Sequence, residues 1–198
     1  MDRRAGSIPG STVHGSSMGA QSVIDPYALH GVILAMAAVA AFTDVRSGLI
    51  PNWLTLPAIV LAPIVHGFLD GMGGLLGSLI GLLACALVPL LIFYRGGMAG
   101  GDVKLFAALG AVGGYALGLE AQFLSLVVAS IYAVGQLTWN GRLATSLGNS
   151  VFIGLNPVLP RKWRRTPPPE LMHRIRLGAA IAFGTLIAVF GRHREFWG

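Results

Sequence analysis

Long apolar runs alternate with short polar segments from about residue 27 onward. A helix that spans the hydrocarbon core of a bilayer needs about 20 predominantly apolar residues, and it satisfies its own backbone polar groups there. The runs that approach this length cover residues 27–43, 53–69, 75–94, 103–119, 123–138 and 177–190. We therefore predict an all-α, polytopic integral membrane protein with about six transmembrane helices.

Two segments contain no such run. Residues 1–26 are rich in Gly and Ser, and their charged start leads into no apolar stretch of signal-peptide type, so we expect a disordered N-terminal tail. Residues 139–176 carry a basic cluster at 161–165, with Trp163 at its centre, followed by three prolines. This pattern is typical of an anchor to anionic lipid; a docking surface for an assembly partner is the alternative. We expect residues 27–198 to form one membrane-embedded domain, with 139–176 as a cytosolic basic loop.

Composition supports a membrane protein. Hydrophobic residues make up 54% of the 198 positions and charged residues 11%, whereas soluble globular domains carry about 25% charged residues. The single cysteine, Cys85, excludes a secreted fold held together by disulfides. The net charge of +6 comes with no basic stripe interleaved with aromatic residues, so nucleic acid is not an expected partner.

The basic residues are divided unequally between the two sides of the predicted bundle. Ten of the 14 Lys and Arg residues fall on one side: Arg46, Arg95, Lys104, Arg142, Arg161, Lys162, Arg164, Arg165, Arg174 and Arg176. The other side holds four, all in the terminal tails: Arg3, Arg4, Arg192 and Arg194. Because loops rich in Lys and Arg stay in the cytoplasm, we expect the first set to be cytoplasmic and both termini to lie outside.

Two of the eight acidic residues lie at span ends, where an ionisable group is costly and therefore indicates a functional site. Asp44 ends the first predicted span and Asp102 opens the fourth. Both fall on the cytoplasmic side at similar depth, although the orientation rests on Lys and Arg alone. The simpler interpretation is that each caps a helix. Two carboxyls that share a proton and a water, however, are the working groups of an aspartic protease.

The residues around the two aspartates resemble the type IV prepilin peptidases, in particular the short, single-domain forms that serve Flp/Tad-type pili. The resemblance is carried by Asp44-Val45-Arg46-x-x-x-Ile50-Pro51-Asn52-x-x-Thr55 and by Gly100-Gly101-Asp102-Val103-Lys104-Leu105. It extends over residues 27–119 and, more weakly, over 175–186. It implies a GxGD-type membrane aspartic protease with Asp44 and Asp102 as catalytic residues, supported by Gly100, Gly101, Lys104 and Asn52. The family pattern has glycine three positions before the second aspartate, where this chain has Ala99.

The resemblance also implies a substrate and a place in the cell. The protein would cleave the basic leader peptide from type IV (Flp-type) prepilins or pseudopilins at the cytoplasmic face of the bacterial inner membrane. Its partners would be these precursors, membrane lipid, and proteins of a pilus or type II secretion assembly. Long, bifunctional relatives carry paired Cys-x-x-Cys zinc ligands, which one cysteine cannot supply, and the five histidines show no ligand spacing. We therefore expect neither a metal nor a cofactor.

Two alternatives explain part of the pattern. A small proton-coupled transporter could use Asp44 and Asp102, but transporters usually place such carboxylates near the bilayer midplane. A non-catalytic membrane subunit of a pilus or secretion assembly explains the spans, but not two acidic residues in matched positions.

Within the pair, the two helix ends indicate a division of labour. Asp102 begins a helix, where the positive end of the macrodipole and the charge of Lys104 favour a carboxylate. Asp44 ends a helix, where the negative end disfavours one, although Arg46 opposes this effect. We therefore hypothesise that Asp102 is the general base and that Asp44 holds the shared proton.

Overall fold

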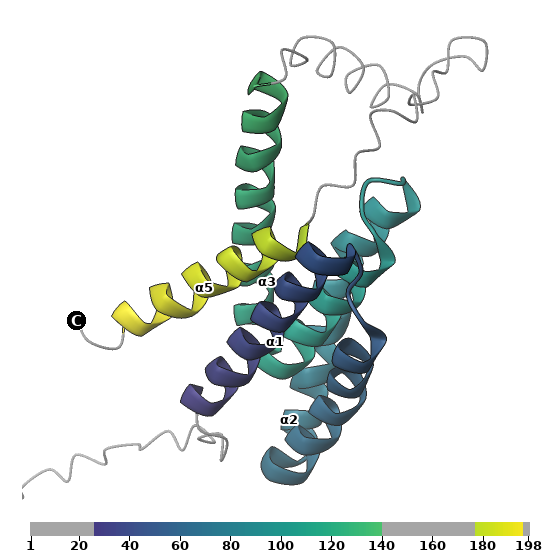
Figure 1. Ribbon diagram of the computed structural model, residues 1–198. Helices are drawn as coiled ribbons and strands as arrows, with labels where there is room; N and C mark the ends of the chain where they lie inside the picture. Colours follow the sequence, from purple (N-terminus) through teal and green to yellow (C-terminus); the bar gives the residue numbers. More distant parts are fainter. Residues whose placement is uncertain (1–25, 140–176, 196–198) are drawn as a thin grey trace, which may run out of the picture.

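A computed structural model of the chain describes residues 26–139 and 177–195, which form four helices (Figure 1). Their bounds are α1 Pro26–Ser47, α2 Asn52–Tyr94, α3 Gly100–Trp139 and α5 Leu177–Glu195. The described residues contain helices and no strands, which confirms the all-α prediction. The predicted tail, apart from Pro26, and nearly all of the predicted basic loop lie outside the described residues.

Helix α2 folds back on itself at Gly71. Its 43 residues would extend over about 65 Å if straight, roughly twice the hydrocarbon thickness of a bilayer. Gly71 has φ 67° and ψ −154°, a conformation that glycine adopts without steric cost. A Cβ atom built on Gly67 would lie 3.4 Å from the Cβ of Leu75, although eight residues of straight helix separate two positions by about 12 Å. The two arms of α2 therefore run back along one another near this turn.

Helix α3 reverses in the same way at Gly114, which has φ 73° and ψ 174°. A Cβ atom on Gly118 would lie 2.8 Å from the Cα of Gly110, again across eight residues. The two turns lie close together, since the Nε2 atom of His66 is 3.1 Å from the carbonyl oxygen of Val112.

The predicted count of about six spans is not confirmed. Within residues 26–139 and 177–195, three helices are long and apolar enough to cross a membrane: the stretches 27–47, 52–94 and 100–136. Helix α5 has a shorter apolar part. The predicted spans 53–69 and 75–94 are the two arms of α2. In α3 the turn comes at Gly114 and not between 119 and 123 as predicted. Glu120 does not lie in a loop between two spans. It belongs to the second arm of α3, and its carboxylate forms an ion pair with Arg192 at 3.0 Å.

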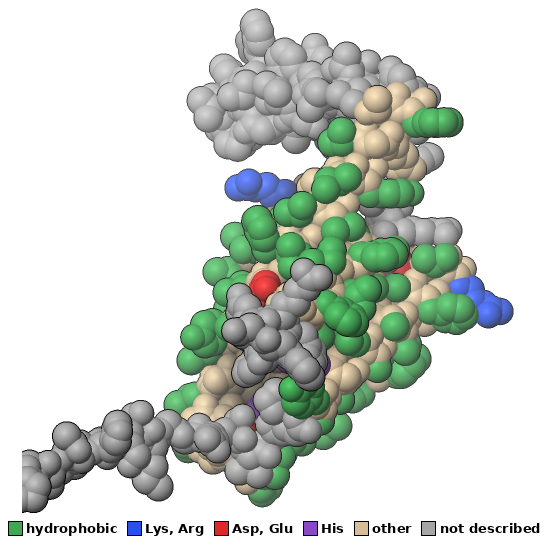
Figure 2. All heavy atoms as spheres, turned by 90° about the vertical axis from the view of Figure 1, so that its left-hand side faces the viewer, with side chains coloured by type: hydrophobic (Ala, Val, Ile, Leu, Met, Phe, Trp, Pro, Cys, Tyr) green, Lys and Arg blue, Asp and Glu red, His purple; other side chains and the backbone are tan. Residues whose placement is uncertain are grey.

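The first arm of α3 lies at the centre of the packing. Leu105, Phe106 and Leu109 are fully buried there, against α2 on one side and α1 and α5 on the other. By contrast, large hydrophobic side chains of all four helices are exposed, and hydrophobic side chains are spread over the described surface visible in Figure 2. A surface of this kind is stable in a bilayer and would be costly in water.

Candidate active site

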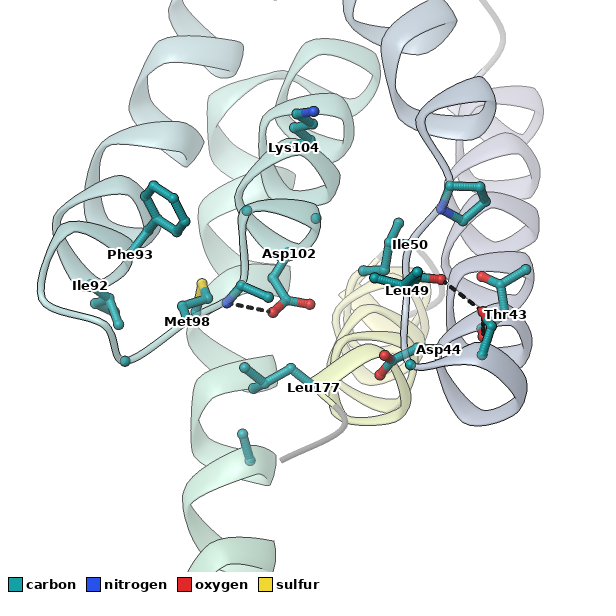
Figure 3. A pocket seen from close by; sticks show the side chains of 18 of the residues that line it. Thr43, Asp44, Leu49, Ile50, Ile92, Phe93, Met98, Asp102, Lys104 and Leu177 are labelled. Carbon is teal, nitrogen blue, oxygen red and sulfur yellow. Dashed lines mark hydrogen bonds between the residues drawn. The ribbon is translucent and has the colours of Figure 1, made fainter. Parts of the chain in front are cut away.

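Asp44 and Asp102 line one open cavity at the end of the bundle where α1 ends and α3 begins (Figure 3). The cavity has a volume of about 1470 Å³. Its walls come from the end of α1, the link to α2, the loop between α2 and α3, and the starts of α3 and α5, together with the second arm of α3. All six residues singled out from the sequence line it: Asp44, Asn52, Gly100, Gly101, Asp102 and Lys104.

Asp44 lies in the last turn of α1 and is only 7% exposed. The helix ends just after it because Gly48, at φ 68°, returns its N–H to the Asp44 carbonyl oxygen at 2.8 Å. The Oδ2 atom of Asp44 accepts a 2.8 Å hydrogen bond from the backbone N–H of Gly178, at the start of α5. The carboxyl therefore links α1 to α5 through two residues that are 134 positions apart in the sequence.

Asp102 is the third residue of α3 and is 5% exposed. Its Oδ2 atom accepts a 3.3 Å hydrogen bond from the N–H of Ala99, while the Ala99 carbonyl accepts the N–H groups of Asp102 and Val103. This is the arrangement of a helix cap, so Asp102 does cap the N-terminus of α3, as the simpler interpretation of the sequence held. The same carboxyl also faces the cavity, so capping does not exhaust its possible roles.

The two carboxyls come from different helices and lie on facing walls of the cavity (Figure 3). Both carboxyls are buried, and both line this one cavity. Two buried acidic groups that share one cavity do not both ionise readily, which is the condition under which a pair shares a proton. Chemically, such a pair can take a proton from water and give one to a leaving group.

The supporting residues have separate roles. Lys104 donates a 2.9 Å hydrogen bond to the Oδ1 atom of Asn52, which ties the first turn of α3 to the first turn of α2. In Figure 3 its ammonium group points away from Asp102. A Cβ atom on Gly101 would lie 3.1 Å from the Cβ of Ile50, so this glycine permits the close approach of α3 to the link between α1 and α2.

Gly178 is the part of the site that the aspartate motifs did not indicate. Its N–H group contacts Asp44, and a Cβ atom in its place would lie 2.6 Å from the Asp44 Cβ. The weak resemblance over residues 175–186 was the available signal, but it assigned no role to α5.

Comparison with known proteins bears on this geometry. The model of the type IV leader peptidase family matches residues 31–134, more than half of the chain and a region that contains both aspartates. The chain belongs to the type IV leader peptidase family. Membership supports a leader peptidase-like protease, and together with the apolar helices it indicates a protein of the bacterial inner membrane. No match was found among curated proteins or among solved structures. Helix α5 lies beyond the part of the chain that matches the leader peptidase family.

Proposed function

We propose that this leader peptidase is an aspartic endopeptidase with Asp44 and Asp102 as its catalytic pair. Its substrates would be type IV (Flp-type) prepilins or pseudopilins, cut at the cytoplasmic face of the membrane. The observation that carries the proposal is that two carboxyls from different helices, each more than nine-tenths buried, line the same open cavity.

The chemistry needs both carboxyls. One of them, as a carboxylate, takes a proton from a water molecule while the water oxygen bonds to the carbonyl carbon of the scissile peptide. The other, as a carboxylic acid, hydrogen-bonds the carbonyl oxygen and supplies a proton to the departing amine as the C–N bond breaks. At the end of the cycle the proton is on the other member of the pair, and exchange with water restores the starting state.

The membrane explains why the bond to be cut would reach this cavity. Arg46, Arg95 and Lys104 lie at the same end of the bundle as the aspartates, and the positive-inside rule assigns that end to the cytoplasm. A basic leader stays in the cytoplasm for the same reason, while the apolar segment that follows it enters the bilayer. The junction between them is then held at the depth of the pair. In this arrangement α1, the two arms of α2, the two arms of α3 and α5 make six crossings.

The test is cleavage of a candidate precursor by the purified protein in detergent or liposomes, followed by mobility shift and N-terminal sequencing of the product. Asp44→Asn and Asp102→Asn should each abolish cleavage while the protein still inserts into the membrane. Asp70→Asn and Glu120→Gln are matched controls, since these carboxyls lie outside the cavity, and they should cleave normally. Substantial turnover by either cavity variant would refute the two-aspartate mechanism.

The same experiment separates the proposal from its alternatives. A non-catalytic subunit leaves the precursor intact with every variant. A proton-coupled transporter also leaves it intact, but moves protons across liposomes in a manner that depends on the two aspartates.

A further inference from the structure

Helix α5 begins directly against Asp44. The Gly178 N–H to Asp44 Oδ2 distance of 2.8 Å lies within the range of charge-assisted hydrogen bonds to a carboxylate, about 2.7–2.9 Å. The corresponding bond to Asp102, from the Ala99 N–H, is longer at 3.3 Å. Of the two carboxyls, Asp44 therefore has the backbone donor better placed to stabilise a negative charge.

Only glycine fits at this contact. A Cβ atom on residue 178 would lie 2.6 Å from the Cβ of Asp44 and 2.9 Å from its Oδ2 atom. Farther along α5, a Cβ atom on Gly184 would overlap the backbone of Ser125 in α3. Close contacts with α1 and α3 thus fix the position of α5, which places the Gly178 N–H against the Asp44 carboxyl.

Among the residues that the structure describes, few other charges face Asp44 and compete with this donor. Across the cavity the titratable group that faces Asp44 is Asp102, and the cavity-lining Lys104 is hydrogen-bonded to Asn52. Arg46, on the same helix as Asp44, is exposed. From Leu177 to Gly191, α5 presents no titratable side chain at all, so it acts on Asp44 through its backbone and the positive end of its dipole.

We propose that the Gly178 N–H is the positioning group that holds Asp44 as the ionised member of the pair and hence as the general base. The proposal rests on the proposed peptidase function. With Oδ2 held by Gly178, Oδ1 receives the proton from water, and Asp102 keeps the proton that goes to the leaving amine. This reverses the division expected from the ends of α1 and α3, because that expectation did not include α5.

The test removes the N–H group without adding a side chain. Replacing Gly178 with glycolic acid, which exchanges the amide for an ester, takes away the donor and leaves no Cβ atom to clash. The acidic limb of the pH profile of kcat should move to higher pH by about 1 to 2 units, the equivalent of one hydrogen bond to a charged group. The value of kcat at low pH should fall while KM stays nearly constant, since this N–H is already hydrogen-bonded to the Asp44 carboxyl.

Two further variants separate positioning from folding. Gly178→Ala should lower kcat and move the acidic limb to higher pH, and larger side chains at position 178 should not restore activity, because every one of them adds the same Cβ atom. Gly191→Ala lies in the same helix with open space around its Cβ position, and it should keep the wild-type profile. An ester variant that keeps the wild-type acidic limb, or moves it downward, overturns the positioning role even if kcat falls. Failure of the proposed function looks different: the wild-type protein then leaves the precursor uncut, or the Asp44→Asn variant cuts it.

Discussion

Close contact between α2 and α3 makes Gly81 a sensitive position. A Cβ atom there would overlap the carbonyl oxygen of Gly110 and lie 2.9 Å from backbone atoms of Gly114 and Tyr115. Gly77, one helical turn earlier, has nothing within 4 Å of its Cβ position. The same glycine-to-alanine substitution can therefore be compared at a crowded position and at an open position of one helix.

The expected effects differ in sign. Alanine is favoured over glycine in a helix by about 1 kcal/mol, so Gly77→Ala should leave the free energy of unfolding unchanged or raise it slightly. At Gly81 the obstacle is backbone, which cannot rotate aside, and overpacking costs about 1–3 kcal/mol or more. We expect a net loss of about 2 kcal/mol for Gly81→Ala. Because Gly110 and Asp102 belong to one arm of α3, a shift of about 1 Å there can also lower kcat/KM by about 100-fold.

The measurement is unfolding of the purified protein in mixed micelles titrated with a denaturing detergent, followed by circular dichroism, together with cleavage kinetics. Gly81→Ala should unfold at a lower denaturant fraction than wild type, and Gly77→Ala should not. If the two variants unfold together and cleave equally well, the described contact between α2 and α3 does not support the site.

Three further outcomes are expected. Cysteines introduced at Ser47 and at the exposed Gly73 should react only from the cytoplasm and only from outside, respectively. The native Cys85 should not react, because it is fully buried; labelling of Ser47 from outside would invert the topology. Gly101→Ala should lower kcat/KM by about tenfold with little change in unfolding, since its Cβ contact is tight and lies beside the cavity; unchanged kinetics would contradict this. Lys104→Met should cost less than about 1 kcal/mol and leave the acidic limb of the pH profile in place, because its ammonium binds Asn52; an upward shift would restore Asp102 as the base.

The location of the two aspartates follows from the sequence by an argument about charge. Asp44 and Asp102 end and open apolar runs, and the distribution of Lys and Arg by itself assigns both to one side of the membrane. The hydrogen bond between Lys104 and Asn52 joins two residues that the motifs also name. Short-range sequence patterns and the positive-inside rule are strong enough signals for these features.

The helix reversals and the close helix contacts could not be predicted, because glycine is used for both. Gly71 and Gly114 reverse their helices, Gly81 permits close packing, and Gly77 does neither. A glycine in an apolar run looks the same in all three cases. The contact between Gly178 and Asp44 was equally hidden, since it joins a backbone N–H to a carboxyl 134 positions away and leaves no mark on the side-chain pattern.

That long-range contact also sets an order of events during biosynthesis. When the ribosome has produced α1, α2 and α3, both acidic side chains and most of the cavity wall already exist, but the donor for Asp44 has not been translated. The bond forms only after residues 177–195 have been made and inserted beside α1 and α3. A nascent chain in the inner membrane therefore carries an incomplete site until α5 docks, and precursors that meet it earlier encounter an Asp44 that is not yet held.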